Sequence, residues 1–247
     1  MQRSTLSKWA VLAASVSLAW FATPARSVHA LATYDATSTA VLKIIGIDHP
    51  GGGQGVVLDG NAVGDVWTDQ GGGGAADGSE VTHVAAADPL NMTVGDSIEQ
   101  TSKSTGSTTP PGFAISDVLT DGELWIDNTS ADAVTVSLEL TYQLRAEATA
   151  AELPEWAIAL ASVDLFGDLA GDLFYDEAYS DSDFDDGLIV SADTVQFDVI
   201  VPPGELELVS LFVDTQGLAV PEPATLMLLL AGLACVAVGQ RRSAQVS

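Results

Sequence analysis

The sequence predicts an all-β protein with an antiparallel β-sandwich, and three observations carry that prediction. One long segment alternates strictly between apolar and polar residues. Several shorter runs are rich in β-branched and aromatic residues, and the segments between them are rich in Gly, Ser and Thr. No helical pattern alternates with these runs, as a parallel α/β fold would require. The length of 247 residues leaves room for one domain, or for two small ones.

The clearest strand is predicted over Ala133–Arg145, where six apolar residues from Val134 to Leu144 alternate with polar ones. Such a period of two gives a strand one dry face and one wet face. Glu123–Asp127 precedes it as a second strand, and Asn128–Asp132 supplies turn residues. We therefore expect these two strands to form a hairpin.

Other runs extend the pattern along the chain. Thr39–Ile47 is β-rich, and Trp156–Leu165 favours a strand because Pro154 limits any helix that its alanines would suit. Phe197–Val201 and Glu205–Val213 flank Pro202-Pro203-Gly204, which predicts a second hairpin.

The remaining segments read as loops. Gly51–Gly55 and Gln70–Gly74 have few side chains to pack, and Thr101–Pro111 has a low-complexity composition of Ser, Thr and Pro. We expect the last of these to be a loop and a candidate subdomain boundary.

Composition and charge give an apparent conflict. The chain carries 34 acidic and 8 basic side chains for a net charge of −26, yet its mean hydropathy is +0.28 and 47% of its residues are hydrophobic. The apolar residues must therefore be concentrated in particular segments. A single cysteine excludes a disulfide scaffold, and the scarcity of Lys and Arg argues against nucleic acid as a partner.

The N-terminal residues 1–30 are typical of a secretory signal peptide. Arg3 and Lys8 precede the apolar stretch Trp9–Ala22, and Val28-His29-Ala30 offers small residues at the positions that signal peptidase inspects. We expect cleavage after Ala30, with Ala32 as the alternative. An uncleaved anchor is the competing interpretation, but the apolar stretch is shorter than the ~20 residues that span a membrane.

The C-terminus carries a second short apolar segment. Val220-Pro221-Glu222-Pro223 is followed by the uncharged run Leu226–Val238 and then by Arg241 and Arg242. As a helix this run would cover only ~20 Å of a ~30 Å hydrocarbon core. A short hydrophobic helix with a basic end and a rigid proline motif before it indicates a processing signal, with contact to the membrane only through this tail before processing.

This tail resembles the PEP-CTERM sorting signal of Gram-negative bacteria. The resemblance rests on Val220, Pro221, Glu222 and Pro223, the hydrophobic run, and the pair Arg241 and Arg242. It implies processing by a membrane-embedded exosortase and a source that makes exopolysaccharide. A GPI signal is the rival interpretation, which the Pro-Glu-Pro element and the arginines disfavour. Residues 243–247 follow the arginines, where family members often end.

The expected organisation is a signal peptide over 1–30, an acidic β-sandwich domain over 31–219, the sorting signal over 220–242 and a tail over 243–247. The middle domain holds 33 acidic and three basic side chains, so its net charge is −30. The only cysteine, Cys235, lies in the sorting signal, so a processed protein has no thiol.

Catalytic motifs are absent from the sequence of the middle domain. His49 and His83 have no sequence-visible partner and read as solvated loop residues, and no Gly-x-Ser-x-Gly or His-Glu-x-x-His motif occurs. Carboxylates are too numerous for any pair to be informative about glycoside hydrolysis. We therefore expect a protein that is not an enzyme, with a secreted hydrolase as the least favoured alternative.

Calcium is the one metal candidate. Asp181, Asp183, Asp185 and Asp186 lie within a seven-residue segment that ends at a glycine, a spacing that can wrap a cation that prefers oxygen ligands. The segment departs from an EF-hand loop because its glycine comes one place late and the twelfth position is not Glu. A solvated acidic loop is the competing interpretation, and we expect no other cofactor.

Sugar binding is the third chemical possibility. Trp67 and Trp125 are candidates for stacking on a pyranose ring, with core or interface packing as the competing explanation. Trp125 alternates with Leu124 and Ile126, so its indole should lie on the opposite strand face.

The sequence thus predicts an exported protein of the cell envelope, cell surface or extracellular matrix. Its expected role is structural or adhesive and linked to exopolysaccharide; the alternative is a carbohydrate- or calcium-binding module. Signal peptidase and exosortase are the expected partners during export.

Overall fold

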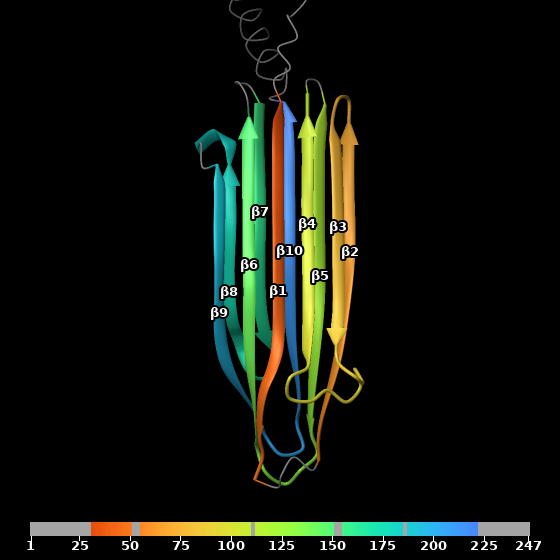
Figure 1. Ribbon diagram of the computed structural model, residues 1–247, viewed down its shortest axis with the longest axis vertical. Helices are drawn as coiled ribbons and strands as arrows, with labels where there is room; N and C mark the ends of the chain where they lie inside the picture. Colours follow the sequence, from red (N-terminus) through yellow and green to blue (C-terminus); the bar gives the residue numbers. More distant parts are fainter. Residues whose placement is uncertain (1–30, 51–54, 110–111, 151–154, 185–186, 222–247) are drawn as a thin grey trace, which may run out of the picture. The chain divides into compact units, whose positions relative to one another are not determined.

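The computed structural model describes residues 31–50, 55–109, 112–150, 155–184 and 187–221. These residues form two five-stranded antiparallel sheets that face each other, and the strands of both sheets are aligned along one common axis (Figure 1). Sheet A has the order β3-β4-β1-β6-β9 and sheet B the order β2-β5-β10-β7-β8. The predicted antiparallel β-sandwich is therefore confirmed. The predicted signal peptide and most of the sorting signal lie outside the described residues.

The strands are long. Their bounds are β1 Ala32–Asp48, β2 Val56–Gly71, β3 Ala75–Ala85, β4 Ser97–Thr108, β5 Phe113–Asn128, β6 Val134–Ala150, β7 Glu155–Gly167, β8 Gly171–Asp181, β9 Leu188–Val201 and β10 Leu206–Pro221. A short 3₁₀ turn, Ser182–Phe184, follows β8.

The strand predicted from alternation is β6, in which every apolar residue from Val134 to Leu144 is buried. The strand continues five residues beyond the predicted end, to Ala150. The interpretation of Trp156–Leu165 as a strand is also confirmed, because Ala157, Ala159 and Ala161 occupy alternate, fully buried positions of β7. Small side chains there face the opposite sheet, and they do not signal a helix.

Both predicted hairpins are wrong. β5 lies in sheet B and β6 in sheet A, and β9 and β10 are divided between the sheets in the same way. Among the described strands, only β3–β4 and β7–β8 are consecutive and paired. Alternation identifies a strand and its buried face, but it does not identify the neighbouring strand.

The Ser/Thr-rich segment is a strand as well, so the predicted loop and subdomain boundary over Thr101–Pro111 are wrong. It forms most of β4, which lies between β3 and β1. Its inner face carries hydroxyl groups, and the Ser104 Oγ donates to the Thr215 carbonyl of the facing sheet at 2.8 Å. A low-complexity composition hid a buried face, on which Ser104 is hydrogen-bonded while Ser102 and Gln100 are buried without a side-chain hydrogen bond.

A tyrosine fills the space between the sheets. Tyr34 of β1 is 2% exposed, and its hydroxyl donates to the Ser116 Oγ at 3.1 Å. A Cβ atom at Gly106 or Gly217 would lie 2.3 Å or 1.9 Å from this ring. Each sheet therefore has a glycine where the ring crosses the interior.

The side chain of Asn128 connects two crossings between the sheets. Asn128 ends β5 and is fully buried. Its Nδ2 lies 2.9 Å from the carbonyl oxygens of Asp132 and Val201 and 3.0 Å from that of Pro202. Its Oδ1 accepts from the Ser130 Oγ at 2.6 Å. One amide thus joins the β5–β6 crossing to the β9–β10 crossing.

We predict that Asn128→Ala lowers the free energy of unfolding by about 2–3 kcal/mol, because buried carbonyl oxygens lose their donor. Chemical denaturation measures this change. The matched control is Asn91→Ala, at an exposed loop position, with an expected change within about 0.5 kcal/mol. Equal stability of the two variants would contradict the role assigned to Asn128.

Candidate functional site

The outer faces of the two sheets differ in chemistry. In the described part of the chain, the basic side chains are Lys43, Lys103 and Arg145, and all three lie on the outer face of sheet A. The outer face of sheet B has none. It combines carboxylates with exposed or half-buried aromatic residues, which are Trp67, Trp125, Trp156, Phe166, Tyr175, Tyr179 and Phe212.

A pocket of about 240 Å³ lies on this face, across three neighbouring strands of sheet B. Register places its six residues in two rows. One row is Trp67 of β2, Asp117 of β5 and Gln216 of β10; the next is Asp65, Leu119 and Asp214 on the same strands. We call these six residues the Trp67 pocket. Each apolar side chain in it therefore has a carboxylate on the neighbouring strand.

The apolar members of the Trp67 pocket face solvent. The side chain of Trp67 is 52% exposed and that of Leu119 is 44% exposed. Neither is needed to fill the interior, whose side chains come from the opposite strand faces. The competing explanation of Trp67 as a core residue is therefore wrong.

Two carboxylates of the pocket interact unfavourably. Burial first, and then the nearby charge of Asp117, together raise the pKa of Asp214 to about 6. Gln216 offsets part of this effect by donating from Nε2 to Asp214 Oδ2 at 2.9 Å. The other oxygen, Oδ1, is buried and accepts no hydrogen bond. When protonated, Asp214 can instead share its proton with Asp117.

A raised pKa of Asp214 in the folded state has a defined effect on stability. The folded protein binds this proton more tightly than the unfolded chain, so this contribution to the free energy of unfolding is present at low pH. It is lost as the pH rises through about 6.

We therefore predict that Asp214→Asn is more stable than the wild type at pH 7 and that the difference shrinks toward pH 4. Denaturation curves from pH 4 to pH 8 measure it. Asp117→Asn should lower the pH at which Asp214 loses its proton, because the charge of Asp117 is one cause of the raised pKa of Asp214. An identical pH profile for the wild type and Asp214→Asn would contradict the pairing.

The second stacking candidate, Trp125, is on the same outer face but outside the pocket. Leu124 and Ile126 are buried and Trp125 points outward, as predicted. It lies eight residues along β5 from Asp117, or ~26 Å at the rise of a strand. The structure therefore does not bring Trp67 and Trp125 into one site.

The calcium candidates are placed only in part. Asp181 is 6% exposed and accepts from Trp156 Nε1 and from the Asp183 backbone N–H, both at 2.9 Å. Asp185 and Asp186 lie outside the described residues. Within the described ranges, no three side chains of His, Cys, Asp or Glu form a group that could hold a metal ion. The calcium site stays a prediction.

The expectation of solvated loop histidines is met only in part, because His49 lies in a loop but is half-buried, and His83 is exposed but lies in a strand. His49 Nε2 lies 2.8 Å from the Ser130 Oγ, so it has a hydrogen-bonding partner. His83 lies in strand β3 and is opposite Glu99 of β4.

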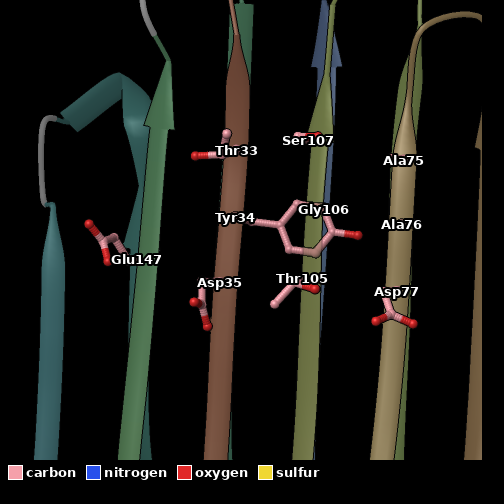
Figure 2. Close-up of a pocket in the computed structure, with 10 residues that line it drawn as sticks. All are labelled: Thr33, Tyr34, Asp35, Ala75, Ala76, Asp77, Thr105, Gly106, Ser107 and Glu147. Atoms are coloured by element: carbon pink, nitrogen blue, oxygen red, sulfur yellow. The ribbon is translucent and has the colours of Figure 1, made fainter.

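A larger depression of about 490 Å³ lies on the outer face of sheet A (Figure 2). Hydroxyl groups of Thr33 and Thr105 and the carboxylates of Asp35, Asp77 and Glu147 line it. Arg145, beside it, pairs with Asp35 at 3.0 Å and with Glu147. The ring of Tyr34 also appears among its lining residues, but this tyrosine is 2% exposed. The depression therefore offers no exposed aromatic surface. Sequence reasoning missed it because its residues come from four strands.

Fold and site together define an acidic β-sandwich with an aromatic pocket on one outer face. At its C-terminus the chain carries the PEP-CTERM protein-sorting motif, whose family model matches residues 219–242. This motif marks an exported, envelope-associated protein that exosortase processes. The curated proteins and the solved structures give no match to the chain.

The first residues of the motif belong to the folded domain. Val220 and Pro221 lie in β10, opposite Trp156 and Glu155 of β7, and β10 is the central strand of sheet B. The predicted C-terminal helix lies outside the described residues. In the part of the chain that the structure describes, no helix has the length and apolar character needed to cross a membrane.

We predict that the exported protein begins at Leu31 and ends no earlier than Val220. Ala32 is fully buried in β1, so cleavage after Ala32 would remove a core residue. Cleavage before Val220 would likewise shorten the central strand of sheet B. Mass spectrometry of the exported protein measures both ends. Detection of a peptide that contains Arg241 and Arg242 in the exported protein would contradict processing of the tail.

Proposed function

We propose that this protein has a structural or adhesive role at the surface or in the extracellular matrix of a Gram-negative bacterium, where it binds exopolysaccharide through the Trp67 pocket. The observation that carries the proposal is the exposed indole of Trp67 among polar side chains that can hydrogen-bond to sugar hydroxyls. The sorting motif supports it, because export brings the protein to the surface where such polymers accumulate.

The pocket suits a single sugar residue. Its volume of about 240 Å³ is below the ~300–1,000 Å³ typical of sites that enclose drug-sized ligands. A flat aromatic surface packs against the apolar face of a pyranose ring, while Asp117 in the same row and Asp65 in the next row accept hydrogen bonds from its hydroxyl groups. An open site on a sheet face also leaves room for the polymer to continue in both directions.

A role in binding, without hydrolysis, is supported by the arrangement of the carboxylates. Glycosidases place two carboxyl groups ~5–9 Å apart on either side of the scissile bond. Asp117 and Asp214 are close enough to share a proton, which leaves no room for a sugar bond between them. We therefore propose that the protein is not an enzyme.

The test is binding of the exported, processed protein to purified exopolysaccharide of the source bacterium, measured by isothermal titration. Trp67→Ala should weaken binding about tenfold, since a stacked aromatic contact contributes ~0.5–1.5 kcal/mol beyond area burial. The matched control is Trp125→Ala, on the same face but outside the pocket, with binding expected within about threefold of wild type. Equal loss in both variants, or no binding by the wild type, would contradict the proposal.

A further inference from the structure

The charge of the Trp67 pocket bears on which sugar it takes. Three of its six residues, Asp65, Asp117 and Asp214, are carboxylic acids, and none is basic. The three basic side chains in the described part of the chain lie on the outer face of the other sheet. A polymer of uronic acids would therefore meet uncompensated negative charge in this pocket, whereas a cationic ligand would be attracted.

One oxygen of the pair Asp117 and Asp214 lacks a donor, although Gln216 donates to the other oxygen of Asp214. Asp214 Oδ1 is buried without a hydrogen bond, and its neighbours across the strands are Leu119 of β5 and Ser162 of β7. At pH values below about 6, a proton retained by Asp214 relieves its repulsion with Asp117 in the free protein, and at higher pH that relief is lost. An ammonium group with three N–H donors can satisfy both carboxylates in place of that proton.

The indole adds a second attraction for the same group. A cation close to the face of a tryptophan is favoured by the ring quadrupole, and Trp67 is directly opposite Asp117 in the strand register. Neighbouring strands lie ~4.8 Å apart, so Trp67, Asp117 and Gln216 span about 10 Å. This distance accommodates one sugar ring on the indole with a ring substituent at the carboxylates.

We propose that the Trp67 pocket selects a cationic amino sugar, the free-amine hexosamine unit of a partly N-deacetylated polysaccharide. This inference rests on the proposed carbohydrate binding and specifies its ligand. The pyranose ring stacks on Trp67, and its ammonium group donates to Asp117 and Asp214. An N-acetylated unit presents no charge to this pair, and a uronic acid presents the wrong sign.

The experiment compares three probes by isothermal titration with the exported, processed protein at pH 6.5 and 0.15 M NaCl. The probes are the hexasaccharides of glucosamine, of N-acetylglucosamine and of galacturonic acid. We expect glucosamine hexasaccharide to bind at least tenfold more tightly than the neutral one, and the galacturonic acid hexasaccharide to give no heat. Addition of EDTA should leave these results unchanged, because no metal ion is part of the contact.

Two variants separate this pocket from the general acidity of the protein. In Asp117→Asn/Asp214→Asn the preference for glucosamine should fall below threefold. The matched control, Glu99→Gln/Glu139→Gln, removes the same charge from the outer face of sheet A and should keep the preference. Thermal melting checks that both variants fold. A further variant, Trp67→Ala, tests the site without changing its charge and should weaken binding of the glucosamine hexasaccharide about tenfold.

The possible results separate the amino-sugar inference from the proposed carbohydrate binding on which it rests. Equal affinity for the glucosamine and N-acetylglucosamine probes, or a preference that survives in the Asp117/Asp214 variant, overturns the amino-sugar inference and leaves carbohydrate binding intact. Loss of binding with EDTA likewise overturns it in favour of a metal-bridged contact. If the exopolysaccharide also fails to bind, both the inference and the proposed function fall.

Discussion

The structure depends on one constraint, that every second side chain of each strand must be buried between the two sheets. The inner strands β1, β4, β5, β6, β7 and β10 obey it over most of their length, the edge strands β2, β3, β8 and β9 obey it only in part, and the inner faces meet in a single core. Where a large side chain such as Tyr34 crosses the interior, Gly106 on the neighbouring strand and Gly217 on the facing sheet leave the space. Some hydroxyls at inner positions, those of Ser38, Ser104 and Thr120, donate to backbone carbonyls of the other sheet or strand. The other half of the side chains is released from packing and is available for function.

That division determines where the acidity of the protein can be tolerated. Most carboxylates lie on outer faces and loops, with Glu155 and Glu207 as buried exceptions, and several carboxylates on the outer face of sheet B are close enough to repel each other. Burial raises the pKa of Asp121, Asp164 and Asp214, and a neighbouring carboxylate adds to the increase in each case. In the described part of the chain, the Lys and Arg side chains all lie on sheet A, where Arg145 pairs with two acids. Sheet B therefore presents a face of one charge sign interrupted by aromatic rings.

Alternation along the sequence was sufficient for the parts of the fold that depend on one strand at a time. It predicted β6 and the outward direction of Trp125, whereas the strand over Trp156–Leu165 was predicted because Pro154 limits a helix there. It failed wherever the outcome depended on the partner strand, since the segments read as hairpins cross between the sheets. It also failed for β4, where Ser and Thr resemble a loop until a facing backbone is known to accept their hydrogen bonds.

The candidate site shows the same limit. The sequence singled out Trp67 as a possible stacking residue, but Asp117 and Asp214 lie 50 and 147 positions away along the chain. Only the register of β2, β5 and β10 places them beside it. The sorting motif, by contrast, could be recognised from sequence because it is read as a continuous segment.

The central claim is that the exported protein binds its ligand in the Trp67 pocket. The most direct measurement is an NMR titration of the ¹⁵N-labelled processed protein with exopolysaccharide. We expect the largest chemical-shift changes at the Trp67 indole N–H and at the backbone amides of residues 65–67, 117–119 and 214–216. Shifts centred on the depression around Asp35, Asp77 and Glu147, with the Trp67 indole unchanged, would contradict it.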